Sequence, residues 1–456
     1  MMYPPATATT PATTPVNIPV NIPVTRRAPA PAGARAMVAA MLFAMMPAMS
    51  FADVPEPLVP IESVEIGANR ELIVNGEPFL PIMSWAQKPS RFSEIRALGF
   101  NTFTGQQRNV NPLEQAEAAQ AAGGYAVAGF GGSGEEAVGH AYLLAWIQGD
   151  EPDMPQRAGQ AGTPDDIEGG EPRRRFEPKR TPAQTLEQYQ AIQAADGSRP
   201  VFVTFTGHFS RTIRSHYSAA EQAELYPAYA RAADVLGFDI YPIYGHGRPG
   251  WLNRPAEAVE QLVEMGDGEK PVYAWIETSK GSRWMTYERQ PDVLPVHTRF
   301  QVWGAIIRGA TAIGYFTHAW APSFSEFAAT DAMREELARI NGQLTRLAPA
   351  ILAPPSERQI ELRLSGGLAG HFKATEHDDE LYIFAQNIDL GENADQLGQF
   401  EPISPRAATG TLIVEGLEAG TTIEVVDEGR TITTEQGEFR DDFDALAEHI
   451  YRIPLR

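Results

Sequence analysis

The stretch Tyr142–Asp153 (YLLAWIQGDEPD) joins an apolar run to a glycine and an acidic tip. Unbroken apolar runs of this length are typical of parallel strands that are covered on both faces. Gly149 follows the run, and Asp150 and Glu151 then stand where the chain would leave the sheet. The sequence therefore predicts a buried strand with carboxylates at its carboxyl end.

Seven similar runs lie on either side of this stretch. They are Phe79–Ser84, Asn101–Thr104, Tyr125–Phe130, Val201–Thr206, Gly237–Tyr241, Val272–Ile276 and Ala312–Thr317. Helical patterns separate them, at Arg91–Leu98, Pro112–Ala122, Glu135–Gly139 (very short), Ala183–Ala195, Ala219–Ala233, Pro255–Met265, Val296–Arg308 and Glu326–Leu347. Eight alternations over about 275 residues predict an α/β fold, the (β/α)8 or TIM barrel. An open doubly wound sheet usually has fewer strands and a glycine-rich loop after the first, and Ser84-Trp85-Ala86 is no such loop.

Smaller segments flank the predicted barrel, which we place at 77–350. Residues 53–76 are expected to lead in as a strand and hairpin with a tight Asn75-Gly76 turn. Ala353-Pro354-Pro355 indicates a linker, and the short alternating runs of 355–456 predict a small all-β sandwich. The polar insertion 153–181 follows the fourth strand, where it either borders the cleft or is disordered.

The N-terminal residues 1–52 resemble a disordered extension followed by a signal peptide. Arginines precede the apolar run Met37–Met49, and small residues follow it, so we expect cleavage near Ala52–Asp53. An uncleaved anchor is the alternative. This segment predicts a secreted or periplasmic protein, and no other run is long enough to suggest a membrane partner after cleavage.

Composition excludes several classes of function. A net charge of −21 argues against nucleic acid and anionic membranes as partners. Cysteine is absent, which rules out disulfides and thiolate chemistry. The sequence has no Gly-x-Ser-x-Gly elbow, no phosphate-binding loop and no histidine spacing typical of a metal site, so we expect neither a cofactor nor a metal. Oligomeric state is not predictable from these features.

Two glutamates stand at equivalent places in the predicted barrel. Glu151 follows the fourth strand and Glu277 ends the seventh, so both would face the mouth at the carboxyl ends of the strands. Retaining glycosidases use two carboxyl groups about 5–5.5 Å apart, one as acid/base and one as nucleophile. Either glutamate alone has a simpler interpretation, because acids at strand ends also cap neighbouring helices.

Over about residues 65–345 this arrangement resembles clan A of the glycoside hydrolases, which carry the acid/base after strand four and the nucleophile after strand seven. The resemblance implies that Glu151 is the acid/base, that Glu277 is the nucleophile, and that the substrate is a carbohydrate, with a β-linkage favoured. Clan members usually have Asn directly before the acid/base, and this chain has Asp150. Asp150 is therefore a candidate for substrate binding and an alternative acid.

Aromatic residues and histidines at the strand ends are the candidates for substrate binding, because sugar rings stack on aromatic faces. They are Trp85, His208, Tyr241, Tyr244, Trp275, His318 and Trp320. The clan resemblance implies that Tyr241 or Tyr244 orients the nucleophile and that Trp320 forms the floor of the −1 subsite. Ordinary core packing is the alternative for each aromatic ring.

The leading hypothesis is hydrolysis of a glycosidic bond by double displacement. One alternative is a carbohydrate-binding barrel without turnover. The other is a metal-assisted barrel enzyme that uses Asp150, Glu151 and Asp153 as oxygen ligands.

Overall fold

The computed structural model describes residues 55–157, 167–168, 171–172 and 176–455. The predicted extension and signal peptide lie outside the described residues. Residues 52–456 form one compact unit, in which the barrel and the C-terminal sheets pack together. None of the helices within the described ranges combines the length and apolar character needed to cross a membrane.

The predicted barrel is confirmed. Eight parallel strands close on themselves, with β15 pairing β4 and β7 pairing β12. The strands are β4 (Ile82–Trp85), β5 (Thr102–Thr104), β6 (Tyr125–Gly129), β7 (Leu143–Ile147), β12 (Val201–Thr206), β13 (Val235–Asp239), β14 (Val272–Glu277) and β15 (Ala312–Phe316). The sixth begins and ends two residues earlier than predicted, because Val235 and Leu236 also pair with β12. Asp239 is consequently the last residue of that strand.

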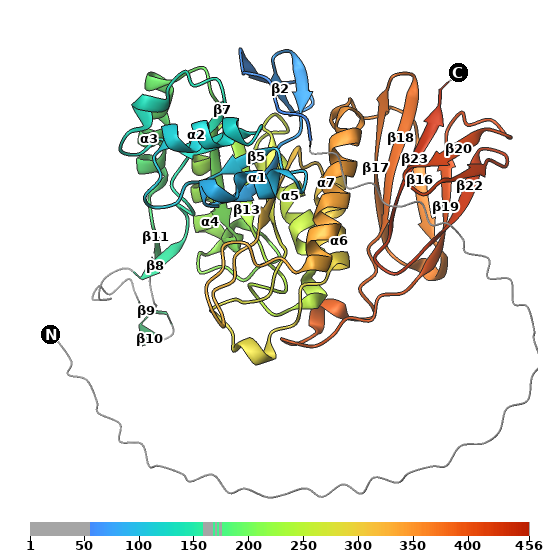
Figure 1. Ribbon diagram of the computed structural model, residues 1–456. Coiled ribbons are helices and arrows are strands. Elements are labelled where there is room, and N and C mark those ends of the chain that lie inside the picture. The colour runs from blue at the N-terminus through green and yellow to red at the C-terminus, as the bar shows by residue number, and fades with distance from the viewer. Residues whose placement is uncertain (1–54, 158–166, 169–170, 173–175, 456) are drawn as a thin grey trace, which may run out of the picture. The chain divides into compact units, whose positions relative to one another are not determined.

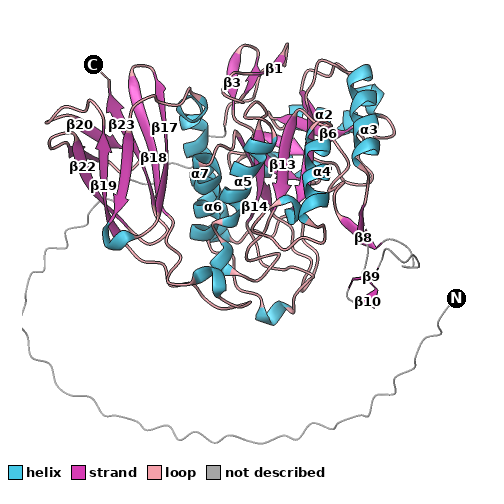
Figure 2. Cartoon of the chain, turned by 180° about the vertical axis from the view of Figure 1, so that it is seen from behind, coloured by secondary structure: helices cyan, strands magenta, loops and turns pink. Residues whose placement is uncertain are grey.

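Helices surround the barrel (Figures 1 and 2). They are α1 (Phe92–Arg96), α2 (Pro112–Ala121), α3 (Pro182–Ala195), α4 (Ala219–Ala230), α5 (Arg254–Met265), α6 (Pro295–Ile307) and α7 (Asp331–Leu352). Capping boxes at Asn111, Thr181 and Ser218 explain why α2, α3 and α4 begin where they do. The predicted third helix is a single 3-10 turn, η2 (Gly134–Ala137), which agrees with its short pattern.

The aromatic side chains of Tyr273 and Trp275 fill the centre of the barrel, and each packs against a glycine on a neighbouring strand. A Cβ atom on Gly237 would lie 2.1 Å from the Tyr273 ring, and one on Gly314 would lie 2.2 Å from the Trp275 ring. Tyr273 is 0% exposed and Trp275 is 2% exposed. The centre of the barrel is therefore a packed core, and any ligand must bind above it, at the carboxyl ends of the strands.

Parts of the insertion after β7 lie within the described residues. Strand β8 (Pro155–Arg157) pairs antiparallel with β11 (Phe176–Pro178), and β9 (Ile167–Glu168) pairs with β10 (Glu171–Pro172). Beyond β11, the Lys179 ammonium donates to the backbone oxygen of Asp150 at 2.6 Å. The base of the insertion thus supports the acidic tip that follows β7.

Antiparallel sheets precede and follow the barrel. The lead-in comprises β1 (Val64–Ile66), β2 (Leu72–Val74) and β3 (Glu77–Phe79). After the barrel, one sheet has the order β16 (Ile360–Leu364), β19 (Ala408–Val414), β22 (Glu438–Phe443). The other has the order β17 (Gly370–His377), β18 (Glu380–Asn387), β23 (Glu448–Pro454), β20 (Thr422–Val425), β21 (Arg430–Thr433). A shared apolar core between the two sheets confirms the predicted sandwich.

The sandwich packs against the barrel beside α6 and α7 (Figure 1). The Trp303 ring of α6 stacks on Phe384 of β18, with 5.9 Å between ring centroids. The Gln386 amide donates to the backbone oxygen of Phe300 at 3.0 Å. These buried contacts fit a sandwich that braces the barrel.

Candidate active site

The acidic tip after β7 faces an acid on another strand. Glu151 adopts a left-handed backbone conformation, with φ of 47°. Its carboxyl group shares a hydrogen bond with the carboxyl group of Asp239, the last residue of β13. Both side chains are half-buried, so they remain open to solvent at the mouth of the barrel. Asp239 was not among the predicted site residues, because the sequence pattern placed it inside the sixth strand.

The surroundings of this acid pair, Glu151 and Asp239, keep it partly protonated. Burial raises the pKa of Glu151 to about 7; the hydrogen bond from Asp239 opposes this, and the charges of Asp150 and Asp153 add to it. Burial also raises the pKa of Asp239 well above its usual range, and the charge of Glu151 raises it further. Near neutral pH the pair keeps at least one proton, carried by Asp239 as the donor of the shared hydrogen bond, because two carboxylates in contact cannot both ionise freely.

Asp153 has a structural role. Its carboxylate accepts hydrogen bonds from the Thr206 backbone N–H at 3.0 Å, the Thr206 hydroxyl at 2.6 Å and the Tyr226 hydroxyl at 3.0 Å. The side chain is fully buried, and Asp150 next to the pair is exposed. The hypothesis of a metal bound by Asp150, Glu151 and Asp153 is therefore wrong for this arrangement, and no cluster of metal ligands occurs within the described part of the chain.

Glu277 lies in a different environment from the acid pair. Its carboxylate accepts hydrogen bonds from the backbone N–H groups of Ile243, at 3.1 Å, and Tyr244, at 2.6 Å. The Gln301 amide of α6 donates a third, at 3.1 Å. The side chain is 0% exposed. Burial raises its pKa to about 7, and these three donors oppose the rise.

The donors identify Glu277 as a cap. Residues 241–247 form a helix-like turn, in which the Gly245 N–H donates to the Tyr241 carbonyl and the Gly247 N–H to the Ile243 carbonyl. The first N–H groups of such a turn have no internal partner, and the Glu277 carboxylate supplies one. Neither carboxyl of the acid pair is among the groups that shift the pKa of Glu277. The role of Glu277 as nucleophile stays a prediction, and its contacts favour the capping role.

The burial of Glu277 makes stability depend on pH. An unfolded glutamate loses its proton near pH 4.3, whereas Glu277 in the fold does so near pH 7. Between these values only the folded state keeps the proton, so the free energy of unfolding falls as the pH rises. Glu277→Gln should reduce this fall, because glutamine does not ionise. Urea unfolding at about pH 5 and about pH 7.5 tests it, and the same fall in both proteins would contradict it.

A cavity of about 220 Å³ opens at the mouth of the barrel. It is lined by Trp85, Ala86, Gln106, Gln107, Arg108, Phe316, His318, Trp320 and Phe324. Phe316 ends β15 and packs on Tyr241, with 4.9 Å between ring centroids. Burial raises the pKa of Tyr241 well above its usual range, and the charges of Asp239 and Glu151 add to the rise. Tyr241 therefore lies between the cavity and the acid pair.

The predicted aromatic residues divide into two groups. Trp85 and Trp320 line the cavity, and Trp320 is 41% exposed, as a stacking platform requires. Trp275 is a core residue, whose indole N–H donates to the Thr204 hydroxyl at 3.2 Å. Tyr244 is buried and packs edge-on against Tyr241, and its hydroxyl has no partner among the described residues.

The two predicted histidines also differ. His318 lines the cavity and is hydrogen-bonded to the Ala86 backbone, while its Nδ1 has no partner within the described residues. Burial lowers its pKa to about 4, so the ring is neutral and Nδ1 is a free acceptor. His208 packs against His216 and Tyr217 and does not line the cavity. Burial and the nearby His216 lower its pKa to about 4.

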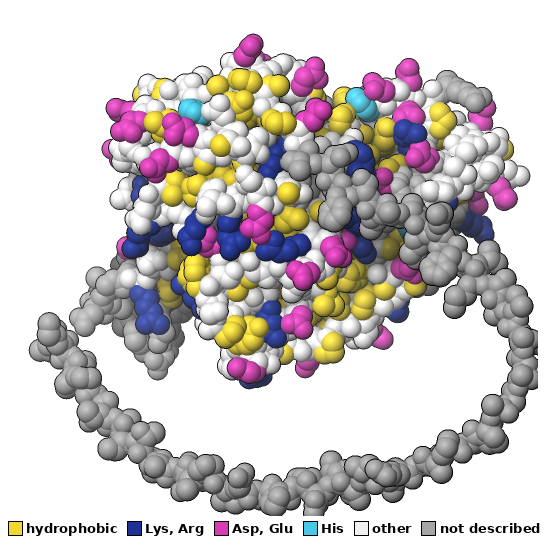
Figure 3. All heavy atoms as spheres, in the orientation of Figure 1, with side chains coloured by type: hydrophobic (Ala, Val, Ile, Leu, Met, Phe, Trp, Pro, Cys, Tyr) yellow, Lys and Arg dark blue, Asp and Glu magenta, His cyan; other side chains and the backbone are white. Residues whose placement is uncertain are grey.

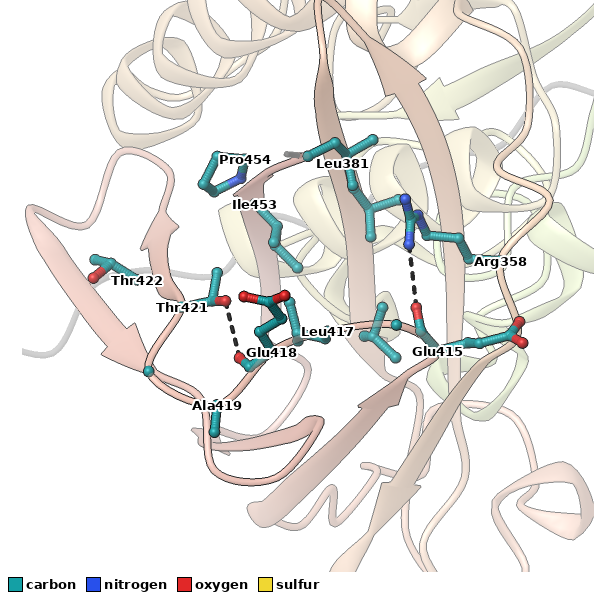
Figure 4. A pocket seen from close by; sticks show the side chains of 14 residues that line it. Arg358, Leu381, Glu415, Leu417, Glu418, Ala419, Thr421, Thr422, Ile453 and Pro454 are labelled. Atoms are coloured by element: carbon teal, nitrogen blue, oxygen red, sulfur yellow. Dashed lines mark hydrogen bonds between the residues drawn. The ribbon is translucent and has the colours of Figure 1, made fainter.

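A larger cavity, of about 290 Å³, lies in the sandwich (Figure 4). The Arg358 side chain donates to the Glu415 backbone oxygen at its edge, at 3.2 Å. Glycine, threonine and aliphatic residues form most of the remaining wall, and no aromatic ring lines it. It therefore offers no stacking surface for a sugar and holds none of the acid pair.

No protein-family profile and no curated protein matches the sequence. Solved structures similar to the chain are glycoside hydrolases. A family 30 endoxylanase from Clostridium papyrosolvens is 13% identical and covers 88% of this chain and 98% of its own, with a TM-score of 0.41. A family 30 xylanase from Clostridium acetobutylicum is 11% identical and covers 82% of this chain and 95% of its own, with a TM-score of 0.45. An endo-1,4-beta-mannanase from Eisenia fetida is 12% identical and covers 61% of this chain and 95% of its own, with a TM-score of 0.40. Similarity at this level carries no argument about chemistry.

Proposed function

We propose that this chain is a glycoside hydrolase in which Glu151 and Asp239 are the two working carboxyl groups. The observation that carries the proposal is their shared hydrogen bond at the carboxyl ends of the barrel strands, with the pKa of Glu151 raised to about 7. One proton on two carboxyl groups is the state that glycoside cleavage needs. One group protonates the leaving oxygen, and the other, as the carboxylate, faces the positive charge that develops at the anomeric carbon.

The spacing of the pair favours retention of configuration. Inverting enzymes keep about 6.5–9.5 Å between their carboxyl groups to leave room for a water molecule, and retaining enzymes keep about 5–5.5 Å. Carboxyl groups that share a hydrogen bond are closer than either distance, and they need to separate less to reach the retaining distance than the inverting one. We assign the acid/base role to Glu151 and the role of nucleophile, facing the anomeric carbon, to Asp239. This assignment requires the proton that Asp239 donates to Glu151 in the free protein to pass to Glu151 when substrate binds. A β-linked substrate and secretion remain parts of the proposal that rest on the sequence.

The cavity beside the pair supports a sugar as substrate. Trp320 and Phe324 are exposed and pack together at 4.9 Å between ring centroids, which gives an apolar surface for the CH face of a sugar ring. The Tyr244 hydroxyl and His318 Nδ1 are buried polar atoms that lack partners among the described residues. Polar groups of a bound sugar would satisfy both.

The direct test is hydrolysis of a panel of oligosaccharides and polysaccharides by the purified protein. NMR of the first product follows the anomer that is released. We expect turnover of at least one glycan class, with the β anomer formed first from a β-linked substrate. Release of the opposite anomer would overturn the retaining mechanism. Tight glycan binding without turnover would favour the carbohydrate-binding barrel.

The raised pKa of Glu151 predicts the pH dependence of the reaction. The acid must carry its proton in the free enzyme, so kcat/KM should fall about tenfold per pH unit above the Glu151 pKa of about 7. Initial rates at low substrate concentration, measured across the neutral and alkaline range, test this. A rate that stays constant to about pH 9 would mean that Glu151 is not the proton donor.

A further inference from the structure

Two arginines at the cavity have no acidic partner. Arg108 lines the cavity, and its guanidinium makes no ion pair with any described residue. Arg283 lies over the Trp284 ring at 5.5 Å and over the Trp320 ring at 5.0 Å, and it too has no carboxylate partner within the described ranges. Both side chains are exposed. Their charges are therefore available to a ligand.

Two other basic residues near the mouth of the barrel are paired with acids. Lys88 forms an ion pair with the buried Glu326, at 2.6 Å, and Lys280 pairs with Asp292, at 3.3 Å. The contrast matters because the whole chain carries a net charge of −21, and acidic side chains are spread across the face seen in Figure 3. Unpaired cations beside the cavity oppose the overall field of the protein, which would otherwise repel an anion.

The surroundings of Arg283 are suited to binding an anion. Contact with two indole rings restrains a guanidinium and leaves its N–H groups for a planar acceptor. The charge of Arg283 also reaches the Tyr244 hydroxyl, where it opposes the rise in pKa that burial causes. That hydroxyl has no partner among the described residues. A ligand that accepts from such a buried donor would relieve the cost of leaving it without a partner.

We infer that the substrate is an anionic glycan, whose carboxylate or sulfate group binds between Arg108 and Arg283 while a sugar ring stacks on Trp320. The inference rests on the proposed function and names its substrate class. Arg283 and the Tyr244 hydroxyl would donate to the anion, and neutral His318 would accept from a sugar hydroxyl through Nδ1. Charge-assisted bonds of this kind distinguish an acidic sugar from its neutral analogue.

The experiment measures binding separately from turnover. Glu151→Gln, which should bind without cleaving, is titrated calorimetrically with β-1,4-linked gluco-oligosaccharides of equal length in three forms: neutral, oxidised at C6 to the glucuronate, and sulfated. We expect at least one anionic form to bind tenfold or more tightly than the neutral form, with an affinity that falls as salt is added. The stronger of the two anionic forms identifies the carboxylate or the sulfate as the natural group.

Arginine variants in the same background locate the site. Arg283→Gln and Arg108→Gln should each remove most of the preference for the anionic form, and Arg283→Lys should keep part of it. Arg289→Gln is the matched control, because Arg289 is also exposed but lies over Phe400, at 4.6 Å. Equal binding of all three forms, absence of anionic binding, or a preference that survives both arginine changes would overturn the inference.

Failure of the inference and failure of the proposed function are distinguishable. If wild-type protein cleaves neutral glycans and Arg283→Gln has no effect, the glycosidase stands and the anionic substrate does not. If the anionic form binds through the arginines and no glycan is cleaved, the recognition site stands and the enzymatic function does not.

Discussion

Replacing Glu151 with glutamine is expected to lower kcat/KM by about 10³-fold, the scale on which a general acid contributes. Glutamine keeps the shape of the side chain and accepts the hydrogen bond of Asp239, but it has no carboxyl proton to donate. The fold should therefore survive while the chemical step fails. The measurement is kcat/KM for the wild type and Glu151→Gln on the same substrate, with unfolding midpoints compared in parallel.

A substrate with a better leaving group provides the control for this prediction. An activated aryl glycoside needs little proton donation, so the defect of Glu151→Gln should shrink on that substrate and stay large on a natural glycan. Asp150→Asn is the matched variant at the neighbouring position, where the acid is exposed. We expect a much smaller loss there. An equal loss would transfer the acid role to Asp150.

Replacing Asp239 with asparagine is expected to lower kcat/KM by about 10²- to 10³-fold. The amide still donates to Glu151, so the pKa of Glu151 and the alkaline fall in activity near pH 7 should remain. What disappears is the carboxylate that faces the anomeric carbon. In Asp239→Ala, added azide should restore turnover and release a glycosyl azide of inverted configuration. Absence of any rescue would make Asp239 a positioning residue for Glu151.

Glu277→Gln decides between the two candidate partners of Glu151. If Glu277 acts as the cap, activity should stay within about tenfold of the wild type, because only the support of the 241–247 turn changes. A folded Glu277→Gln protein that has lost about 10³-fold would restore the nucleophile predicted from the sequence.

Much of the fold was predictable because buried parallel strands have a simple pattern. Continuous apolar runs such as Val201–Thr206 can be recognised as strands from their composition alone. The structure places all eight predicted strands in the barrel. The residues of the site were harder to predict from the sequence. Gly149 separates Glu151 from its strand, whereas Asp239 stands between Phe238 and Ile240 inside an apolar run. The structure alone shows that β13 ends at Asp239 and that the Asp239 side chain contacts Glu151 there.

Glu277 shows the opposite difficulty, because the residue was predicted from the sequence but its contacts could not be. Its position at the end of a strand is visible in the sequence, but the groups that bind it are backbone N–H groups of residues 243 and 244, 34 and 33 residues away. Every residue except proline carries such a donor, so no pattern of side chains indicates the contact. The two meanings of an acid at a strand end, catalyst or cap, are separated by geometry alone.

The packing at the barrel centre limits how related sequences can diverge. Gly237 has no room for a Cβ beneath Tyr273, and Gly314 has none beneath Trp275. A larger residue at either glycine requires a smaller ring opposite, so each pair should covary, with single replacements absent and compensated double replacements tolerated. Homologues in which glycine and ring change together would preserve the same barrel with its bulk moved to the neighbouring strand.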